Sequence, residues 1–267
     1  MIVRKSPDEI EAIAAAGKIL IRCHEMLRRK ARPGVTTAEL DEAAEKYIRS
    51  QGAEPAFKGY RGFPGSICAS PNSMVVHGIP GSYTLSRGDI LSVDIGVILD
   101  GWVADAAITH PIGHVSAAAN RLLASTKAAL FDAVEQCRPG KRLGDISHAV
   151  QRRVEQDGFS VIRSLVGHGV GREMHEDPQI PNFGEPGTGP ELAEGMVFAI
   201  EPMVNAGGHD VRMGSDNWAV YSQDGSLAAH FEHTVAVTAE GPRILTPWHL
   251  DEGASEQPVA ATLTGRR

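Results

Sequence analysis

Hydrophobic positions recur with two different periods along this chain, and the two periods predict two kinds of element. Residues 7–30 and 116–136 carry apolar side chains at intervals of three to four, which is typical of amphipathic helices. Two further helical stretches run up to Gly52 and Gly158. Apolar runs of strand character then occupy residues 90–110, 196–204 and 230–237. The pattern therefore predicts a fold of the α/β (α+β) class.

The first apolar run contains a turn signal that predicts a hairpin and its register. Asp100-Gly101 is a two-residue turn sequence between alternating apolar segments. This turn places Asp94 and Asp105 on the same face as diagonal neighbours, roughly 7–8 Å apart at the backbone. We also expect the glycine opposite Asp105 to leave room beside that carboxylate. The predicted pairs are Leu99 with Trp102, Asp94 with Ala107, and Asp105 with Gly96.

The two halves of the chain share a set of landmarks. Arg32-Pro33-Gly34 recurs 106 residues later as Arg138-Pro139-Gly140, and Gly52 recurs at the same interval as Gly158. An acidic and an apolar residue follow each triplet, as Glu39-Leu40 and as Asp145-Ile146.

The strands repeat as well, because Gly88 precedes Asp94 by six residues and Gly195 precedes Glu201 by six. We therefore predict one domain over residues 1–250, built from two α-α-β-β halves with pseudo-twofold symmetry around a central antiparallel sheet. The halves are roughly residues 1–115 and 116–250. Residues 251–267 contain few large apolar side chains and predict a disordered tail.

Composition narrows the range of partners and compartments. The 267 residues carry a net charge of −7, which argues against general binding to nucleic acid or to an anionic membrane. The three cysteines show no CxxC spacing and fit a reducing cytosol. The N-terminus has no signal-peptide core, and no window approaches a span of about 20 apolar residues. We therefore expect a cytoplasmic protein.

Five residues of metal-ligand type lie in or beside the segments that read as buried. A carboxylate in an apolar strand costs several kcal/mol unless it is paired or binds a metal. The one histidine of the set lies between two glycines, where the backbone can approach closely. Either aspartate alone, Asp105 above all, has an alternative interpretation as a turn or edge residue. The candidate ligands are Asp94, Asp105, His168, Glu201 and Glu232.

Together these ligands predict a two-metal hydrolytic centre. A set dominated by carboxylates with one imidazole favours Mn, Fe, Co or Zn over Mg, Ca or a structural zinc site. In such a centre, a metal-bridging water attacks a carbonyl and a nearby carboxylate carries its proton to the leaving amine. His77 and His175 are structural residues in isolation, and near a metal centre they are candidate donors to the substrate. No GxSxG, GxGxxG or P-loop motif supports a rival chemistry.

The chain resembles the type I methionine aminopeptidases over roughly residues 3–248. The intervals between His168, Glu201 and Glu232 are too short for the long insertion typical of type II enzymes. The resemblance implies the pita-bread fold, in agreement with the repeat. The matching segments are PGVTTAELD, VVHGIP, LSVDIG, GHGVGREMHEDP, FAIEPMVNAG and FEHTVAVT.

The resemblance also implies a role for each site residue. Asp94 would bind one metal through both oxygens, and Asp105 and Glu232 would bridge both ions. His168 and Glu201 would complete the second site, with Glu201 also acting as the proton shuttle. Two histidines would contact the substrate, His175 at the scissile carbonyl and His77 beside the scissile nitrogen. The pocket for the methionine side chain would be formed by Tyr60, Phe63, Cys68 and Trp218.

The chain departs from the family pattern near this pocket. Phe57 and Met174 stand where Cys and Phe are common, and His230 stands where Gln is frequent. Asp105 lies in VADAAIT, where bacterial members often read GDTS, so Ala104 and Ala106 replace residues around the aspartate. We expect these changes to alter the shape of the pocket and its affinity, and not the reaction.

The implied function is removal of the initiator methionine from nascent chains with a small second residue. The ribosome is then an implied transient partner, and we expect a monomer. An X-Pro exopeptidase is an alternative, although such proteins usually carry a further N-terminal domain. A metal-free binding module with the same fold is another alternative, but it predicts broken ligand positions, and all five are intact.

Overall fold

The protein is described by a computed structural model over residues 1–248, so the expected disordered tail at 251–267 lies outside the described residues. Four long helices form where the periodicity places them. They are α1 (Pro7–Lys30), α2 (Thr37–Ser50), α3 (Ala117–Val134) and α4 (Leu143–Gln156). None of these described helices combines the length and the apolar character needed to cross a membrane.

The repeated acidic residues cap the second helix of each half. Glu39 lies in the first turn of α2, and its carboxylate accepts a hydrogen bond from the backbone N–H of Thr36 at 2.7 Å. Asp145 does the same at the start of α4, accepting from Arg142 N–H at 2.8 Å. The apolar residues that follow, Leu40 and Ile146, are completely buried. Each copy of the repeat therefore contains one residue that caps a helix and one residue that packs in the core, and the two copies are 106 residues apart.

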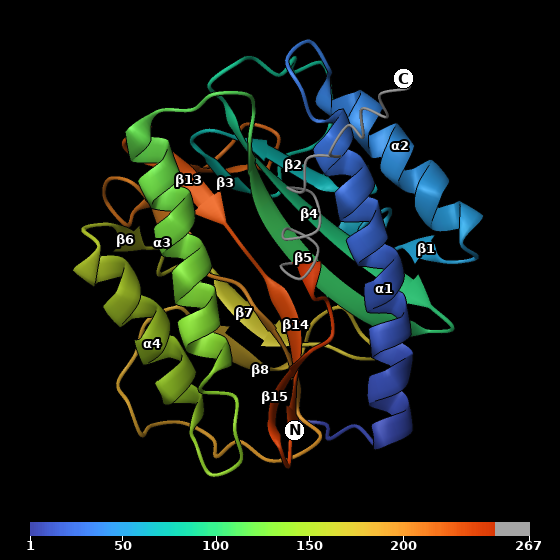
Figure 1. The fold of residues 1–267 in the computed structure, drawn as a ribbon, viewed down its shortest axis with the longest axis vertical. Helices are drawn as coiled ribbons and strands as arrows, with labels where there is room; N and C mark the ends of the chain where they lie inside the picture. The colour runs from blue at the N-terminus through green and yellow to red at the C-terminus, as the bar shows by residue number, and fades with distance from the viewer. Residues whose placement is uncertain (249–267) are drawn as a thin grey trace, which may run out of the picture.

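All strand pairings are antiparallel, and the two largest sheets belong to different halves of the chain (Figure 1). The first joins β1 (Glu54–Pro55), β4 (Ile90–Leu99) and β2 (Cys68–Pro71), with β5 (Trp102–Pro111) paired to β4. The second has the order β15 (Gly241–Ile244), β14 (His233–Thr238), β9 (Val197–Ile200), β7 (Val166–Gly169) and β8 (Glu176–Pro181).

Two smaller sheets complete the described strands. One has the order β13 (Ala228–His230), β10 (Met203–Asn205) and β6 (Ser160–Val161). The other has the order β11 (Val211–Met213), β12 (Val220–Ser222) and β3 (Met74–Val76). A short 3-10 helix, η1 (Tyr60–Gly62), lies between β1 and β2.

The halves meet at a seam where β5 and β14 form no regular backbone ladder, so the central sheet expected from the sequence is divided there. Elsewhere, β3 of the first half pairs with β12 of the second half. Thr234 of β14 crosses the seam, because its hydroxyl accepts from Asp105 N–H at 3.0 Å and donates to Asp105 C=O at 2.7 Å. Beside it, Glu232 N–H donates to Ala107 C=O at 2.9 Å. These bonds replace a backbone ladder between β5 and β14.

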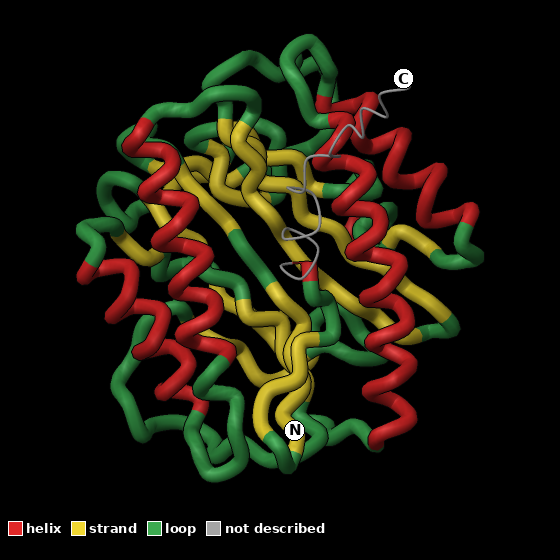
Figure 2. The backbone as a smooth tube through the Cα atoms, in the orientation of Figure 1, coloured by secondary structure: helices red, strands yellow, loops and turns green. Residues whose placement is uncertain are grey.

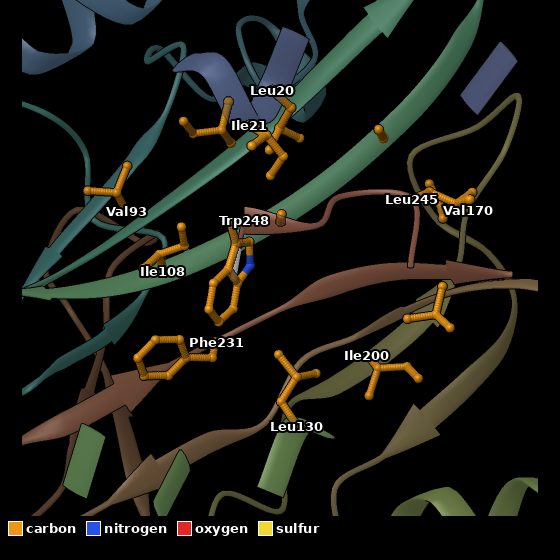
Figure 3. Packing of buried hydrophobic residues seen from close by; sticks show 14 of the residues in the cluster. Leu20, Ile21, Val93, Ile108, Leu130, Val170, Ile200, Phe231, Leu245 and Trp248 are labelled. Atoms are coloured by element: carbon orange, nitrogen blue, oxygen red, sulfur yellow. The ribbon is translucent and has the colours of Figure 1, made fainter. Parts of the chain in front are cut away.

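The helix pairs flank the strands, with α1 and α2 over the first half and α3 and α4 over the second (Figure 2). The largest hydrophobic cluster includes residues of both halves. Its members come from α1, from the β4–β5 hairpin, from α3 and from segments next to the last strands. They include Leu20, Ile21, Val93, Ile108, Leu130, Phe231 and Trp248 (Figure 3). The predicted domain limits of 1–250 and the halves at 1–115 and 116–250 remain predictions.

Candidate metal centre

The β4–β5 hairpin has the register that the sequence predicts. Leu99 pairs with Trp102, and the remaining pairs follow in step along the ladder. Asp100 and Gly101 have φ angles of 51° and 74°, as a two-residue turn of type I′ requires. Consecutive strand residues point to opposite faces, so Asp94 projects away from the core side on which Val93 lies (Figure 3). Asp105 shares that face with Asp94.

Neighbouring strands of the second half supply the other candidate ligands. His168 on β7 pairs with Ala199 on β9, and Glu201 follows the end of β9 directly. Glu232 lies between β13 and β14. The glycines around His168 are required by close packing: a Cβ at Gly167 would lie 2.5 Å from the Ala199 carbonyl oxygen, and one at Gly169 would overlap another backbone carbonyl.

The structure brings these side chains together across the seam. Ligand atoms of Asp105, His168 and Glu232 all lie within 4.8 Å of one another. His168 Nε2 is 3.5 Å from Glu201 Oε1 and 3.9 Å from Asp105 Oδ2. The Nδ1 atom of His168 lies 2.9 Å from the Gly169 carbonyl oxygen, to which it donates, and this leaves Nε2 as the free ligand atom. Asp94 lines the same cavity.

Burial makes this cluster of carboxylates electrostatically unfavourable. It raises the pKa of Asp94, Glu201 and Glu232 well above ordinary values, and repulsion among the carboxylates raises them further. Burial also raises the pKa of Asp105 to about 7. Three carboxylate oxygens are buried without a hydrogen-bond partner among the described residues, namely Asp94 Oδ1, Asp105 Oδ1 and Glu232 Oε1.

A divalent cation removes this disadvantage, because it supplies the positive charge that the cluster lacks and coordinates the unpaired oxygens. The imidazole is suited to such a role, since burial lowers the pKa of His168 and keeps the ring neutral. The buried Asp, His and Glu residues therefore fit divalent metal binding.

A cavity of about 160 Å³ opens onto the carboxylates and contains all the expected pocket residues. Phe63 and Trp218 meet edge to face, with ring centroids 5.1 Å apart. Phe57 and Arg61 also line this cavity. Arg61 was not predicted from the sequence as a residue of this site. It has a left-handed backbone conformation (φ 49°), and no local sequence motif indicates that conformation. The expected residues on the wall are Tyr60, Phe63, Cys68, His77, His175 and Trp218.

The two additional histidines stand at this cavity in different settings. The His175 ring lies 4.2 Å from the His168 ring, and its Nδ1 is 2.9 Å from the Tyr60 hydroxyl. Burial lowers the pKa of His175 to about 4, with nearby positive groups adding to the effect. Burial also lowers the pKa of His77. Both rings are therefore neutral at pH 7 and able to donate one N–H to a substrate.

Gly96 leaves space that a side chain would fill. A Cβ there would lie 2.7 Å from Met174 Cε and 2.8 Å from Phe57 Cε1. The missing side chain therefore makes room for Met174 and for Phe57, and Phe57 lines the cavity. Gly96 faces Asp105 across the ladder, and its nearest side-chain neighbours include Met174.

A second cavity of about 200 Å³ lies beside the first and is lined by some of the same acidic and histidine residues. It shares His77, Asp94, His175 and Glu201 with the first cavity. Its remaining wall is formed by Val76, Ser164, Leu165, Val166, Met203 and His230. Two of the carboxylates and two histidines therefore line both cavities.

Comparison with known proteins gives consistent matches over almost the whole chain. The model of metallopeptidase family M24 matches residues 11–239. Methionine aminopeptidase 1 of Bacillus subtilis is 52% identical over 246 residues, covering 92% of this chain and 99% of that protein. The crystal structure of methionine aminopeptidase from Thermotoga maritima superposes with a TM-score of 0.91 at 44% identity, covering 92% of this chain and 99% of that one.

A more distant structure shares the fold alone. Prolidase from Pyrococcus furiosus superposes with a TM-score of 0.75 at 24% identity, covering 91% of this chain and 65% of that one. These likenesses confirm the predicted pita-bread fold and its mixed α/β class.

Proposed function

We infer that this chain, which belongs to metallopeptidase family M24, is a metal-dependent aminopeptidase that removes the N-terminal methionine of proteins and peptides. One observation carries this function: buried carboxylates from both halves converge with His168 on a cavity whose other wall is apolar and aromatic. The carboxylates suit hydrolysis at a metal centre, and the apolar wall suits a methionine side chain.

For the centre itself, we propose two divalent ions, chosen from Mn, Fe, Co and Zn. Asp94 would hold one ion through both oxygens, Asp105 and Glu232 would bridge the two, and His168 and Glu201 would complete the second site. Residues in these positions would hold ions that could supply Lewis-acid chemistry, polarising a carbonyl and lowering the pKa of a water molecule. The unpaired oxygens of Asp94, Asp105 and Glu232 support this assignment.

The protein's own residues then handle the substrate and its protons. Glu201 takes a proton as the oxygen of water bonds to the scissile carbonyl carbon, and it delivers that proton to the nitrogen when the C–N bond breaks. His175 donates to the carbonyl oxygen, and His77 contacts the scissile nitrogen. The products are free methionine and a peptide with a new N-terminal amine, so atoms and charge balance.

The methionine side chain would pack against the walls of the first cavity. Phe63 and Trp218 present an aromatic corner, which suits a polarisable thioether. Tyr60 and Cys68 line the same space. The residues shared by the two cavities support a scissile bond that would lie between this space and the second cavity, which would take the small second residue.

Neither alternative has comparable support. The prolidase likeness shows the fold alone and covers 65% of that longer protein. A metal-free binding module does not account for a cluster of buried carboxylates that line one cavity and include oxygens without a partner among the described residues. For the cell, we propose that the chain acts as a cytoplasmic monomer on nascent polypeptides, with transient contact with the ribosome.

Metal removal and replacement test the function. The protein is stripped with a chelator, and Mn, Fe, Co or Zn is added back singly. Release of methionine from Met-Ala and Met-Gly peptides is measured against X-Pro and Leu-Ala peptides. We expect metal-dependent release of methionine that is lost in Glu201→Ala. Cleavage of X-Pro in place of Met peptides, or a lack of metal binding, would contradict the proposal.

A further inference from the structure

We propose that His230 is a positioning residue that donates a hydrogen bond from Nε2–H to Glu201 Oε2 and so orients the oxygen that carries the proton. The inference rests on the proposed function, because it assigns a partner to the proton shuttle of that reaction. His230 is 1% exposed, and its Nε2 atom has no hydrogen-bond partner among the described residues. A buried polar nitrogen without a partner is costly, and a proton on Nε2 together with an acceptor in the working state would remove that cost.

The backbone of His230 is fixed on both sides. Its N–H donates to Thr109 Oγ1 at 2.9 Å, and Thr109 Oγ1 donates to the His230 carbonyl oxygen at 2.8 Å. The Ser92 hydroxyl lies 2.8 Å from Thr109 Oγ1 and donates to it, because the single proton of Thr109 is already used. On the other edge, His230 pairs with Met203 in the β10–β13 ladder. The imidazole is therefore presented from a rigid base.

The two oxygens of Glu201 face two different imidazoles. Oε1 lies 3.5 Å from His168 Nε2, and Oε2 lies 3.5 Å from His230 Nε2. Since His168 Nδ1 donates to a carbonyl, its Nε2 is an acceptor or ligand atom, and Oε1 belongs with the proposed metal site. The remaining oxygen, Oε2, is then the one left to take up and release a proton.

A hydrogen bond from His230 would leave one lone pair of Oε2 for the proton and would hold the carboxylate plane. The present distance of 3.5 Å is just outside the usual N–H···O range, and catalytic hydrogen bonds often shorten when the reacting complex forms. Nε2 is also 3.8 Å from Glu232 Oε2, so the same donor faces two carboxylates of the centre. A metal-ligand role for Nε2 is the competing interpretation.

Two substitutions at His230 separate these roles. His230→Gln keeps an N–H donor of similar reach but removes the imidazole, and His230→Leu removes the donor with an apolar group of similar size. The metal-loaded variants are compared by kcat and KM on a Met-Ala peptide and by the visible absorption spectrum of the Co(II)-loaded protein. His110 provides matched controls, since it too is buried with an unpartnered Nε2 among the described residues, but does not line either cavity of the centre.

If His230 positions Glu201, His230→Leu lowers kcat by about 10–100-fold with KM within about threefold, as expected for loss of a group that orients a catalytic residue. His230→Gln then recovers to within about fivefold of the wild type, and the Co(II) bands stay at the same wavelengths in both variants. His110→Gln and His110→Leu leave kcat within about twofold. If His230→Leu does not fold, His230→Asn, whose amide is too short to reach Glu201, takes its place and is expected to show the same loss of kcat.

A readout without metal or turnover completes the test. In the metal-free protein labelled with ¹⁵N-histidine, we expect a His230 signal with a protonated Nε2 whose proton shifts in Glu201→Ala. Equal loss of kcat in His230→Gln and His230→Leu together with displaced Co(II) bands would overturn the proposal in favour of a metal ligand. Unchanged kcat in both variants would overturn it outright. A wild-type protein that binds metal but releases no methionine would instead refute the proposed function. In that case the ¹⁵N-histidine spectrum of the metal-free protein still shows whether His230 Nε2–H contacts Glu201.

Discussion

Lys5 and Glu176 form a buried ion pair that ties the N-terminal segment to the loop of His175. Lys5 Nζ lies 2.6 Å from Glu176 Oε2, and the two side chains are 2% and 11% exposed. The other oxygen of Glu176 accepts from the backbone N–H groups of Arg172 at 2.8 Å and Glu173 at 3.3 Å. Residues 171 positions apart in the sequence therefore shape one turn beside the candidate substrate cavity.

Breaking this pair is expected to reduce both stability and turnover. Lys5→Met leaves the Glu176 carboxylate buried without its cation, which costs about 3 kcal/mol of unfolding free energy. Because His175 is the next residue along the chain, we also expect kcat to fall by about tenfold. Urea unfolding and steady-state kinetics on a Met-Ala peptide measure the two effects.

The control breaks an exposed pair. Arg243 forms an ion pair with Glu11, but these side chains are 43% and 60% exposed, so Arg243→Met should leave both the unfolding free energy and kcat nearly unchanged. Equal losses in the two variants would show that burial of the Lys5 pair does not matter.

The Thr234 bridge across the seam is expected to support metal affinity. Thr234→Val keeps the shape but removes both hydrogen bonds to the backbone of Asp105. Two buried backbone groups lose their partners, so we expect a loss of about 2–4 kcal/mol in stability and about 10–100-fold in metal affinity. Denaturant unfolding and calorimetric titration with Mn(II) measure these quantities.

Thr126→Val is the matched control. Thr126 is fully buried, and its hydroxyl donates to the Leu122 carbonyl within α3, away from the seam. Its substitution should leave the affinity for Mn(II) within about twofold. A Thr234→Val protein with wild-type affinity would show that the bridge has no influence on the centre.

Gly96→Ala should alter substrate binding more than the chemical step. The added methyl group would collide with the ends of Met174 and Phe57, which must move. We expect KM for Met peptides to rise about fivefold, with a stability cost of about 1–2 kcal/mol from overpacking. Gly81→Ala, where the nearest atom is 3.9 Å away, is the control with no expected change. A fall in kcat at constant KM would indicate that position 96 acts on the carboxylates instead.

Stabilisation by metal should increase as pH rises. The folded, metal-free protein holds a proton on Asp105, whose pKa is raised to about 7, while the unfolded chain loses that proton near its ordinary pKa. The unfolded state thus binds fewer protons between about pH 4 and 7, so this group lowers the stability of the metal-free protein as pH increases. Metal binding displaces the proton and removes the penalty.

The measurement is the shift in unfolding midpoint on adding Mn(II), compared between pH 5.5 and pH 8. Burial also lowers the pKa of histidines outside the centre, such as His24 and His110. Their effect on stability is the same with and without Mn(II), so it cancels when the two unfolding midpoints are subtracted. Proton release on binding at pH 6, measured by calorimetry in two buffers, provides a second check. A metal-induced shift that is larger at pH 5.5 would contradict the raised pKa values.

Short-range patterns in the sequence were enough to predict the local structure of several parts of this fold. The Asp100-Gly101 turn determines its own register, because a two-residue turn leaves one pairing for the strands that it joins. Glu39 and Asp145 stood out in the sequence as matching positions of the repeat, and the structure shows that each accepts a hydrogen bond from the backbone N–H three residues earlier, at the start of its helix. The five candidate ligands stood out by chemistry alone, since a carboxylate in an apolar run calls for a partner.

The tertiary structure decided which residues that are distant in the sequence contact one another. Only the folded chain shows that the sheet is divided at Thr234, that Gly96 accommodates Met174, and that His230 faces Glu201. These contacts join segments packed by the shape of the whole core, and no local energy in either segment encodes them. The sequence by itself therefore determined which groups are available for catalysis, whereas packing between the two halves decided which atoms of those groups face one another.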